Sequence, residues 1–261
     1  MSIFFRDHTF EEIQSYIDRN ALVILPVGTI EEHGPHLPVE TDVRIAEEVA
    51  KIIGEEMKDE IPLLVMPGVW AGYSPKVMAD WPGNMQLKPR VFEAMIHDIC
   101  ASLIEMGFRK IMMLDCHGQH APMLNMATKE LADEYGAYIC VTSPLTFSAK
   151  EFNEVRKSER GGVLHACEWE TALMMRFSEH VHMDRVISEP MRYHSDFVSG
   201  DSAMSGQKVV WSTWGLQKAK HGVYGDPEKA TLETAEVIVA ALKKNYRAFM
   251  LEYWQHPGRE G

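Results

Sequence analysis

The stretch ALVILPVGTIEEHGPHLPVETD, residues 21–42, indicates the fold of this chain. Its first seven residues form a continuous apolar run that ends at Gly28, which is typical of a strand covered on both faces. The periodicity of residues 43–58 then predicts a helix. A covered strand followed by a helix is typical of a parallel sheet with helices on its faces.

The same alternation continues through the first half of the chain. Short apolar runs predict further strands over 63–66, 111–114 and 138–141. Helical periodicity predicts helices over 9–19, 88–106 and 122–135, and a glycine follows each of the last two, as helix C-termini favour. We therefore predict an α/β fold, a three-layer αβα sandwich with a mostly parallel central sheet.

The second half of the chain is less regular. Beyond Pro144 we predict a helix over 168–177, an irregular segment over 185–217 and a last helix from about 227 to 254. Asp226 is the expected cap of that last helix, and Pro227 its first residue. Because no composition shift marks a linker, we expect one domain over 1–261, with a frayed tail over 255–261.

Composition narrows the class of protein. The net charge of −12 and the pI near 5.5 argue against nucleic acid and anionic membranes as partners, since both require a basic face. No window approaches the roughly 18 apolar residues of a membrane span, and the first residues lack the order of a secretory signal. The four cysteines lack CxxC spacing, which indicates reduced thiols. We expect a cytoplasmic protein that acts on a small molecule.

Carboxylates and histidines are crowded into residues 31–42. Glu31 and His33 lie two positions apart, so they point the same way in an extended segment, and Asp42 follows where the next helix should begin. Taken singly, each is an ordinary loop or helix-entry residue. Together, in a loop stiffened by proline and glycine, they match the ligands that zinc and similar divalent metals prefer.

Two distant segments supply possible partners. Ligands of open parallel sheets gather at the strand ends, and His117 follows the strand predicted over 111–114. Glu170 shares an apolar helix stripe with Leu173 and Met174, so its carboxylate must meet a cation, meet a hydrogen-bond donor or titrate neutral. We favour metal ligation for Glu170. The neighbouring Glu168 points elsewhere and is interpreted as a solvated or helix-entry acid.

Such a set of residues suits hydrolysis. Two or three carboxylates with two or three imidazoles can hold two divalent ions, which activate water and polarise a carbonyl. His165 is the best candidate for a histidine that moves the proton instead of binding metal. No GxSxG, GxxxxGK[ST] or GxGxxG motif occurs, which disfavours serine hydrolases, nucleoside triphosphatases and dinucleotide dehydrogenases.

Five motifs are spread over nearly the whole chain: LPVGTIEEHGPHLP at 25–38, Thr41-Asp42, His117-Gly118, HACEWET at 165–171 and GVYGDP at 222–227. Together, and in this order, they resemble the creatininase, or creatinine amidohydrolase, family.

The resemblance implies a site and an assembly. It implies a dinuclear zinc or manganese site with Glu31, His33, Asp42, His117 and Glu170 as ligands, Asp42 bridging the two ions. It implies that His165 carries the proton, and we place Gln119 and Glu168 with it as candidate catalytic residues. It also implies a layered α/β fold and a homo-oligomer, often a hexamer.

Departures from the family pattern concern the substrate. Gly118-Gln119 stands where creatininase has a Tyr-Glu pair, and Gly161-Gly162 where it has a Trp-Asp pair, so creatinine itself is not expected. Asp115-Cys116-His117 replaces an Asn-Gly-His run of many relatives. The candidate substrate-binding residues are Trp81, Asn84, Gly118, His120 and Lys76, most of which offer hydrogen bonds.

Family resemblance implies several reactions that share attack of water on a carbonyl. We place opening of a cyclic amide slightly ahead of C–C cleavage of an oxidised inositol. A phosphate-bearing substrate is disfavoured, because no glycine-rich anion cradle with adjacent Lys or Arg is evident. A metal-binding protein without catalysis and a metal-dependent aldolase or isomerase are the alternatives from other classes.

Overall fold

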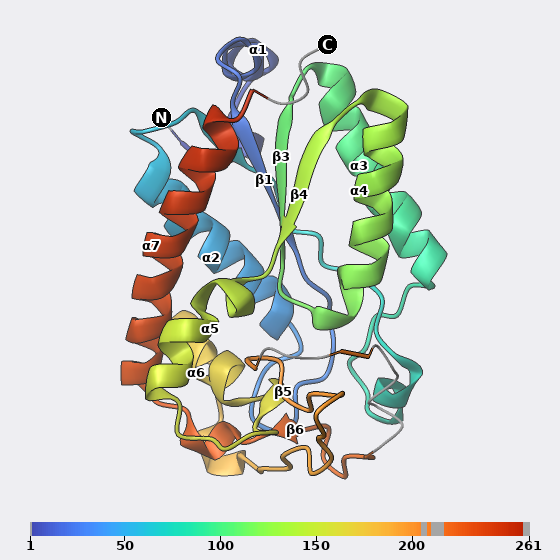
Figure 1. The fold of residues 1–261 in the computed structure, drawn as a ribbon, viewed down its shortest axis with the longest axis vertical. Coiled ribbons are helices and arrows are strands. Elements are labelled where there is room, and N and C mark those ends of the chain that lie inside the picture. Colours follow the sequence, from blue (N-terminus) through green and yellow to red (C-terminus); the bar gives the residue numbers. More distant parts are fainter. Residues whose placement is uncertain (1, 205–207, 210–216, 258–261) are drawn as a thin grey trace.

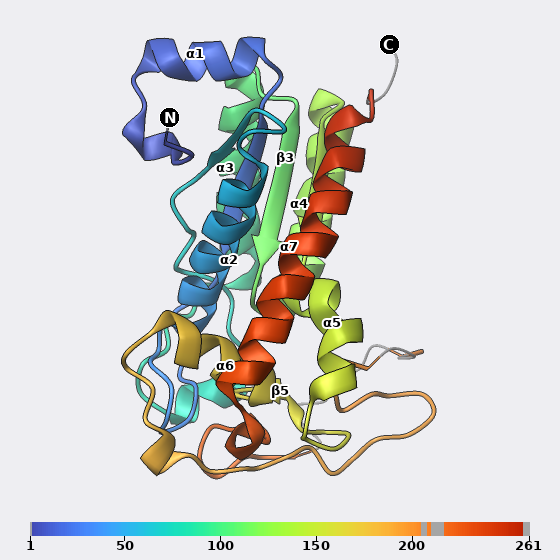
Figure 2. The same cartoon turned by 90° about the vertical axis from the view of Figure 1, so that its left-hand side faces the viewer.

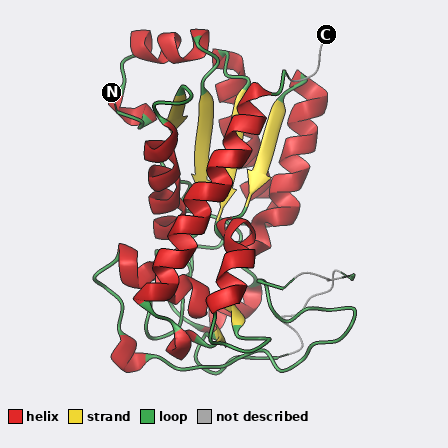
Figure 3. Ribbon diagram, turned by 60° about the vertical axis from the view of Figure 1, so that its left-hand side comes forward, coloured by secondary structure: helices red, strands yellow, loops and turns green. Residues whose placement is uncertain are grey.

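A parallel four-stranded sheet forms the centre of the protein. The computed structural model describes residues 2–204, 208–209 and 217–257. The sheet has the order β2-β1-β3-β4, and every neighbouring pair is parallel. Its strands are β1 (Leu22–Val27), β2 (Leu63–Val65), β3 (Lys110–Asp115) and β4 (Tyr138–Thr142). Figure 3 shows the strand arrows running toward one end of the molecule, where loops gather.

Helices cover both faces of this sheet. Leu22 and Ile24 of β1 pack into a core with α2 (Thr41–Met57) and α7 (Leu232–Gln255). Val23 and Leu25 point the other way, into a core with α3 (Pro89–Met106) and α4 (Ala121–Tyr135). The predicted three-layer αβα sandwich is thus confirmed, and its layers are visible in Figure 1.

Smaller elements collect at the carboxyl ends of the strands. They are α5 (Pro144–Val155), α6 (Glu168–Phe177) and an antiparallel pair formed by β5 (Val163–His165) and β6 (Tyr224–Gly225). Single 3-10 turns lie over Phe5–Asp7, Lys76–Asp80, Gly118–His120, Met183–Arg185 and Pro227–Lys229. Figure 2 shows α5, α6 and β5 at this end and α1 (Phe10–Asp18) at the opposite end.

Two predictions about the second half of the chain are wrong. The last helix does not begin at Pro227: a 3-10 turn ends at Lys229, Ala230 is extended, and α7 is capped by Thr231. Asp226 makes no capping bond and instead accepts a hydrogen bond from Ser188. In addition α5 was not predicted, although Ser143 and Pro144 provide an acceptable helix start. The tail forms part of α7 up to Gln255, and residues 258–261 of the predicted frayed end lie outside the described residues.

Other expectations can be compared with the described residues. Residues 186–204 and 208–209 contain neither helix nor strand, as predicted for the irregular segment. All four cysteines are free thiols. Among the described helices, none has the length and apolar composition needed to cross a bilayer.

Candidate metal centre

The order of the sheet brings two loops together. The chain leaves β1 toward β2 on one side, while β3 and β4 lie on the other, so the ends of β1 and β3 flank a point where the strand order reverses. Gly28 at the end of β1 touches the start of α2, because a Cβ there would lie 2.6 Å from the backbone nitrogen of Val43. This close approach places Asp42, in the first turn of α2, beside the loop that follows β3.

Glu31, Asp42 and His117 form a first group of buried ligand atoms. Nδ1 of His117 lies 2.9 Å from Oδ2 of Asp42, and its Nε2 lies 3.4 Å from Oε2 of Glu31. One ligand atom from each residue lies within 4.8 Å of the others. Three elements therefore contribute: the loop after β1, the first turn of α2 and the loop after β3.

His33, Asp42 and Glu170 form a second group with the same spacing. Nε2 of His33 lies 3.2 Å from Oδ1 of Asp42 and 3.9 Å from Oε1 of Glu170. The backbone of Glu31 holds the other ring nitrogen, with Nδ1 of His33 at 3.0 Å from its carbonyl oxygen. Oε2 of Glu170 accepts a hydrogen bond from the nitrogen of Cys167 at 3.0 Å. Ligand atoms held from behind in this way are typical of metal sites.

Several of these atoms are buried and have no hydrogen-bond partner among the described residues. They are both carboxylate oxygens of Glu31, Oδ2 of Asp42, and Nε2 of His33 and of His117. Leaving buried polar atoms unpaired costs free energy, and a cation between them would satisfy all of them. The residues therefore fit divalent metal ions.

The electrostatics of the metal-free site agree with this interpretation. Burial lowers the pKa of His33, but the carboxylates around it, Asp42 foremost, outweigh burial and raise that pKa to about 10. Burial also lowers the pKa of His117, while Glu31 and Asp42 raise it to about 9. Burial raises the pKa of Asp42, yet the two histidines hold it well below its usual range. Without metal, protonated imidazoles balance the buried carboxylates.

His165 lies beside both groups but belongs to neither. It ends β5, and the backbone turns sharply after it because Ala166 has a φ of +50°. Its Nε2 is 2.8 Å from the carbonyl oxygen of Glu32, its Nδ1 is 3.7 Å from Oε1 of Glu31, and its ring centre is 4.3 Å from that of His33. His165 is thus within reach of the cluster from one side.

The structure gives Glu168 a buried position at the start of α6. Its carboxylate accepts hydrogen bonds from the nitrogens of Lys157 at 2.9 Å and Ser158 at 2.8 Å. The expectation that Glu168 is solvated is therefore wrong, because the loop after α5 packs over its carboxylate and donates hydrogen bonds to it. Its place at the helix entry is as predicted. Glu168 ties the loop after α5 to the helix that carries Glu170.

The predicted substrate-binding residues lie in different surroundings. Asn84 braces the loop: its side-chain oxygen accepts from the nitrogen of Glu32 at 3.1 Å, and its nitrogen donates to the carbonyl of Trp81 at 2.8 Å. Trp81 lines a cavity of about 370 Å³ that Glu32 and His33 of this loop also line. Lys76 is exposed and lines neither this cavity nor the one beside Glu170 that is described below.

The residues after β3 are also divided. His120 is buried, and Nδ1 of its ring lies 3.0 Å from Oδ1 of Asp115, which also accepts a hydrogen bond from the nitrogen of His117. Asp115 therefore orders this loop. Gln119 is half-buried, and Gly118 is exposed and lines a cavity next to Glu170.

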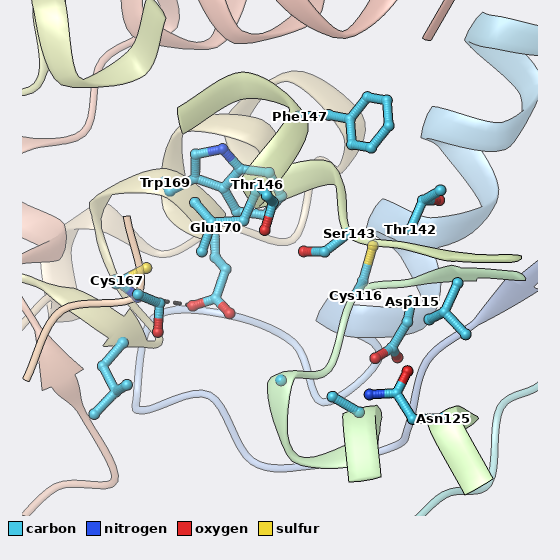
Figure 4. A pocket seen from close by; sticks show the side chains of 16 residues that line it. Asp115, Cys116, Asn125, Thr142, Ser143, Thr146, Phe147, Cys167, Trp169 and Glu170 are labelled. Atoms are coloured by element: carbon cyan, nitrogen blue, oxygen red, sulfur yellow. Dashed lines mark hydrogen bonds between the residues drawn. The ribbon is translucent and has the colours of Figure 1, made fainter. Parts of the chain in front are cut away.

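This second cavity has a volume of about 440 Å³ and reaches the cluster at Glu170. Hydroxyl and amide groups that were not predicted line it, together with Asp115 and Glu170: Asn125, Thr142, Ser143, Thr146 and Ser202. Figure 4 shows Glu170 beneath Trp169 and Thr146, with Ser143 and Asn125 on the side of Asp115. Applying the strand-end rule to the fourth strand would have found Thr142 and Ser143.

The fold and this cluster define an α/β protein with a candidate metal centre at the carboxyl ends of its strands. A family model described as "Creatininase: Creatinine amidohydrolase" matches residues 6–250. The chain belongs to the creatininase family and is a hydrolase of that family.

Three curated relatives show the range of this family. The chain is 27% identical to 3-dehydro-scyllo-inosose hydrolase of Thermotoga maritima over 72% of its own length and 61% of the relative, so it spans less than two thirds of that protein. It is 26% identical to creatinine amidohydrolase of Pseudomonas putida over 72% of the chain and 77% of the relative. It is 27% identical to mycofactocin precursor peptide peptidase of Mycolicibacterium smegmatis over 92% and 87%.

Solved structures confirm the fold. A putative creatinine amidohydrolase from Bacteroides fragilis superposes with a TM-score of 0.76 at 27% identity, covering 92% of both chains. A structure titled "Creatininase Mn" superposes with a TM-score of 0.79 at 21% identity, covering 98% of this chain and all of the other. A mutant creatininase of Zn-Zn type superposes with a TM-score of 0.79 at 22% identity, covering 98% of this chain and 99% of the other.

Proposed function

We propose that this protein is a hydrolase that uses two divalent ions, zinc or manganese, to cleave a small polar substrate at a carbonyl. The observation that supports this most directly is the position of Asp42, which belongs to both groups of candidate ligands. A carboxylate shared in this way is typical of a bridging ligand between two ions. Glu31 and His117 would complete one coordination sphere, His33 and Glu170 the other.

The residues around the ions have distinct tasks in this proposal. When bound, the two ions supply Lewis-acid activation of water and of the substrate carbonyl. His165 accepts a proton and returns it to the leaving group, because it approaches the cluster without belonging to either ligand group. The backbone carbonyl of Glu32 orients its ring. Gly118 lines the cavity, and we expect it and the neighbouring Gln119 to contact the substrate.

The lining of the cavity supports a polar substrate. Its hydroxyl and amide groups offer hydrogen bonds, and its volume of about 440 Å³ lies in the range of small-molecule sites. Cleavage of a C–N bond in a cyclic amide is our first choice, since relatives named as an amidohydrolase and as a peptidase both cleave amide bonds. The replaced aromatic positions argue against creatinine.

Ring opening of an oxidised inositol is the second candidate. The relative from Thermotoga maritima, named for hydrolysis of an inosose, supports it. Such a reaction also begins with attack of water on a polarised carbonyl, so the same residues would serve. The two candidates differ in the bond that breaks, and substrate tests can separate them.

The test is a substrate screen with metal-reconstituted protein and a Glu170→Gln control. Creatinine, small lactams, formamidopyrimidines and oxidised inositols form the panel. We expect turnover of a lactam or inosose that the control lacks. Full activity of the control would remove Glu170 from the site, and loss of thermal stability on chelation without any hydrolysis would favour a structural role for the metals.

Labelled water separates hydrolysis from aldol cleavage or isomerisation. A hydrolase incorporates one oxygen from water into its product, whereas an isomerase that enolises the polarised carbonyl incorporates none by that route. The exchange of carbonyl oxygen with water in the absence of enzyme is measured separately and subtracted. Product that then carries no labelled oxygen would contradict the proposal.

A further inference from the structure

A larger outer hollow adjoins the cavity of about 440 Å³ beside Glu170. It has a volume of about 920 Å³ and is lined by α5, by the loop that follows α5 and by residues 202–204. Thr146 of α5 and Ser202 line both cavities, so the two cavities adjoin at these residues. A substrate whose carbonyl lies at the metal centre would reach the outer hollow by extending past these two residues.

The two compartments carry opposite charge. The charged residues lining the inner cavity are Asp115 and Glu170, both carboxylates. Those lining the outer one are Lys150, Arg156 and Arg160. In a chain with a net charge of −12, three cations around one hollow, without a carboxylate among its lining residues, are unexpected from composition alone.

Arg156 does not supply free charge to this hollow. Its guanidinium forms a two-pronged pair with Asp201, at 3.0 and 2.8 Å. It also donates to the side chain of Asn153 at 3.3 Å and to the carbonyl oxygen of Glu159 at 2.7 Å. The pair is neutral overall and forms a rigid wall. The unneutralised charge comes from the exposed Lys150 and Arg160.

The wall is held in place without any ligand. Asp201 accepts hydrogen bonds from the nitrogens of Gly161 at 2.8 Å and Ala203 at 3.1 Å. Glu168 binds the nitrogen of Ser158, so the wall is tied to the first turn of α6, which carries Glu170. The outer compartment is therefore preorganised relative to the metal ligand, which reduces the free-energy cost of binding a group there.

We propose that Lys150 and Arg160 form an anion subsite and that the substrate carries a carboxylate or phosphate group in addition to the carbonyl that reacts. The anion lies in the outer compartment, and Thr146 and Ser202 flank the connecting part of the molecule. The identity of the reacting carbonyl rests on the proposed function, whereas anion binding does not. The sequence-based argument against a phosphate group looked for a glycine-rich cradle, and these cations come from α5 and the loop after it.

Ligand-observed NMR titrations of the zinc-loaded full chain test the subsite directly. The probes are methyl phosphate, propionate and the neutral 1-propanol. We expect the double variant Lys150→Glu/Arg160→Glu to bind at least one of the two anions at least about tenfold more weakly than the wild-type protein does. Its affinity for 1-propanol should be unchanged. Loss of phosphate binding alone, or of propionate binding alone, identifies the substrate's anionic group. Binding should also weaken with rising salt, as it does for exposed charges.

A matched variant separates local from long-range charge. Lys88→Glu/Lys129→Glu changes the net charge by the same amount, at exposed positions that line neither compartment. It should retain wild-type anion affinity. Equal affinities in all three proteins, or an equal loss in both variants, would overturn the subsite. Failure to hydrolyse any carbonyl substrate would refute the proposed function but leave these affinities interpretable, since they require no turnover.

Discussion

Oδ2 of Asp42 lies 2.9 Å from Nδ1 of His117, although one residue begins α2 and the other follows β3. The other oxygen of Asp42 faces His33 at 3.2 Å. One side chain thus connects two clusters of ligand atoms that would otherwise be separate. This arrangement makes Asp42 the position at which the two-ion proposal is easiest to test.

Asp42→Asn should remove both ions, whereas Glu170→Gln should remove mainly the one that His33 shares. An amide lacks the charge of a carboxylate and bridges cations poorly. Metal content per chain, measured by mass spectrometry after gel filtration, distinguishes the variants. Circular dichroism verifies the fold. An Asp42→Asn protein that keeps one full equivalent of metal would show that Asp42 serves a single ion.

His165→Ala should bind metal normally and turn over about 100- to 10,000-fold more slowly, the usual effect of losing a general acid or base. The reason is that His165 lies outside both ligand groups. Metal content and steady-state rate on the substrate identified by the screen are the two measurements. If metal content fell together with the rate, His165 would have to be reclassified as a ligand.

Metal loading should release protons. The pKa values of about 10 for His33 and about 9 for His117 mean that both rings are protonated in the metal-free protein at pH 7.5. A ring must be neutral to bind metal, so loading should release about two protons, a number that falls toward none above pH 10. Calorimetric titration in buffers of different ionisation enthalpy gives the count. The His117→Ala variant should release about one proton fewer on metal loading. An unchanged number of protons would contradict the assignment of His117 as a ligand that is protonated before the metal binds.

Gly222→Ala should disturb the site through Glu32. Gly222 has a φ of +70°, and a Cβ there would lie 2.1 Å from Oε2 of Glu32. Gly136→Ala is the matched control, because Gly136 has a φ of +63° and nothing within 4 Å of the added Cβ. The control should cost about 1 kcal/mol, and Gly222→Ala about 1 to 3 kcal/mol more. Urea unfolding measures both, and equal losses would show that Glu32 moves aside freely.

The sequence was sufficient for most of the sheet and for part of the site. Short apolar runs identified β1 to β4, because helices cover both faces of the sheet. The side chains of β1, β2 and β3 are buried throughout, and those of the edge strand β4 are partly exposed. The rule that ligands gather at strand ends predicted that Asp42 and His117 would meet. The apolar stripe around Glu170 correctly indicated that its carboxylate needed a partner, since Leu173 and Met174 are fully buried.

Only the tertiary structure decided how these pieces meet. That Asp42 lies between two groups of ligands depends on the close contact of Gly28 with α2, which no local pattern encodes. Three features depend on α5 and on segments far apart in sequence: the burial of Glu168, the bracing role of Asn84 and the two adjoining cavities. Periodicity reports which face of an element is buried, whereas the shape and charge of a cavity arise from side chains of several elements, and their relative placement is set by packing.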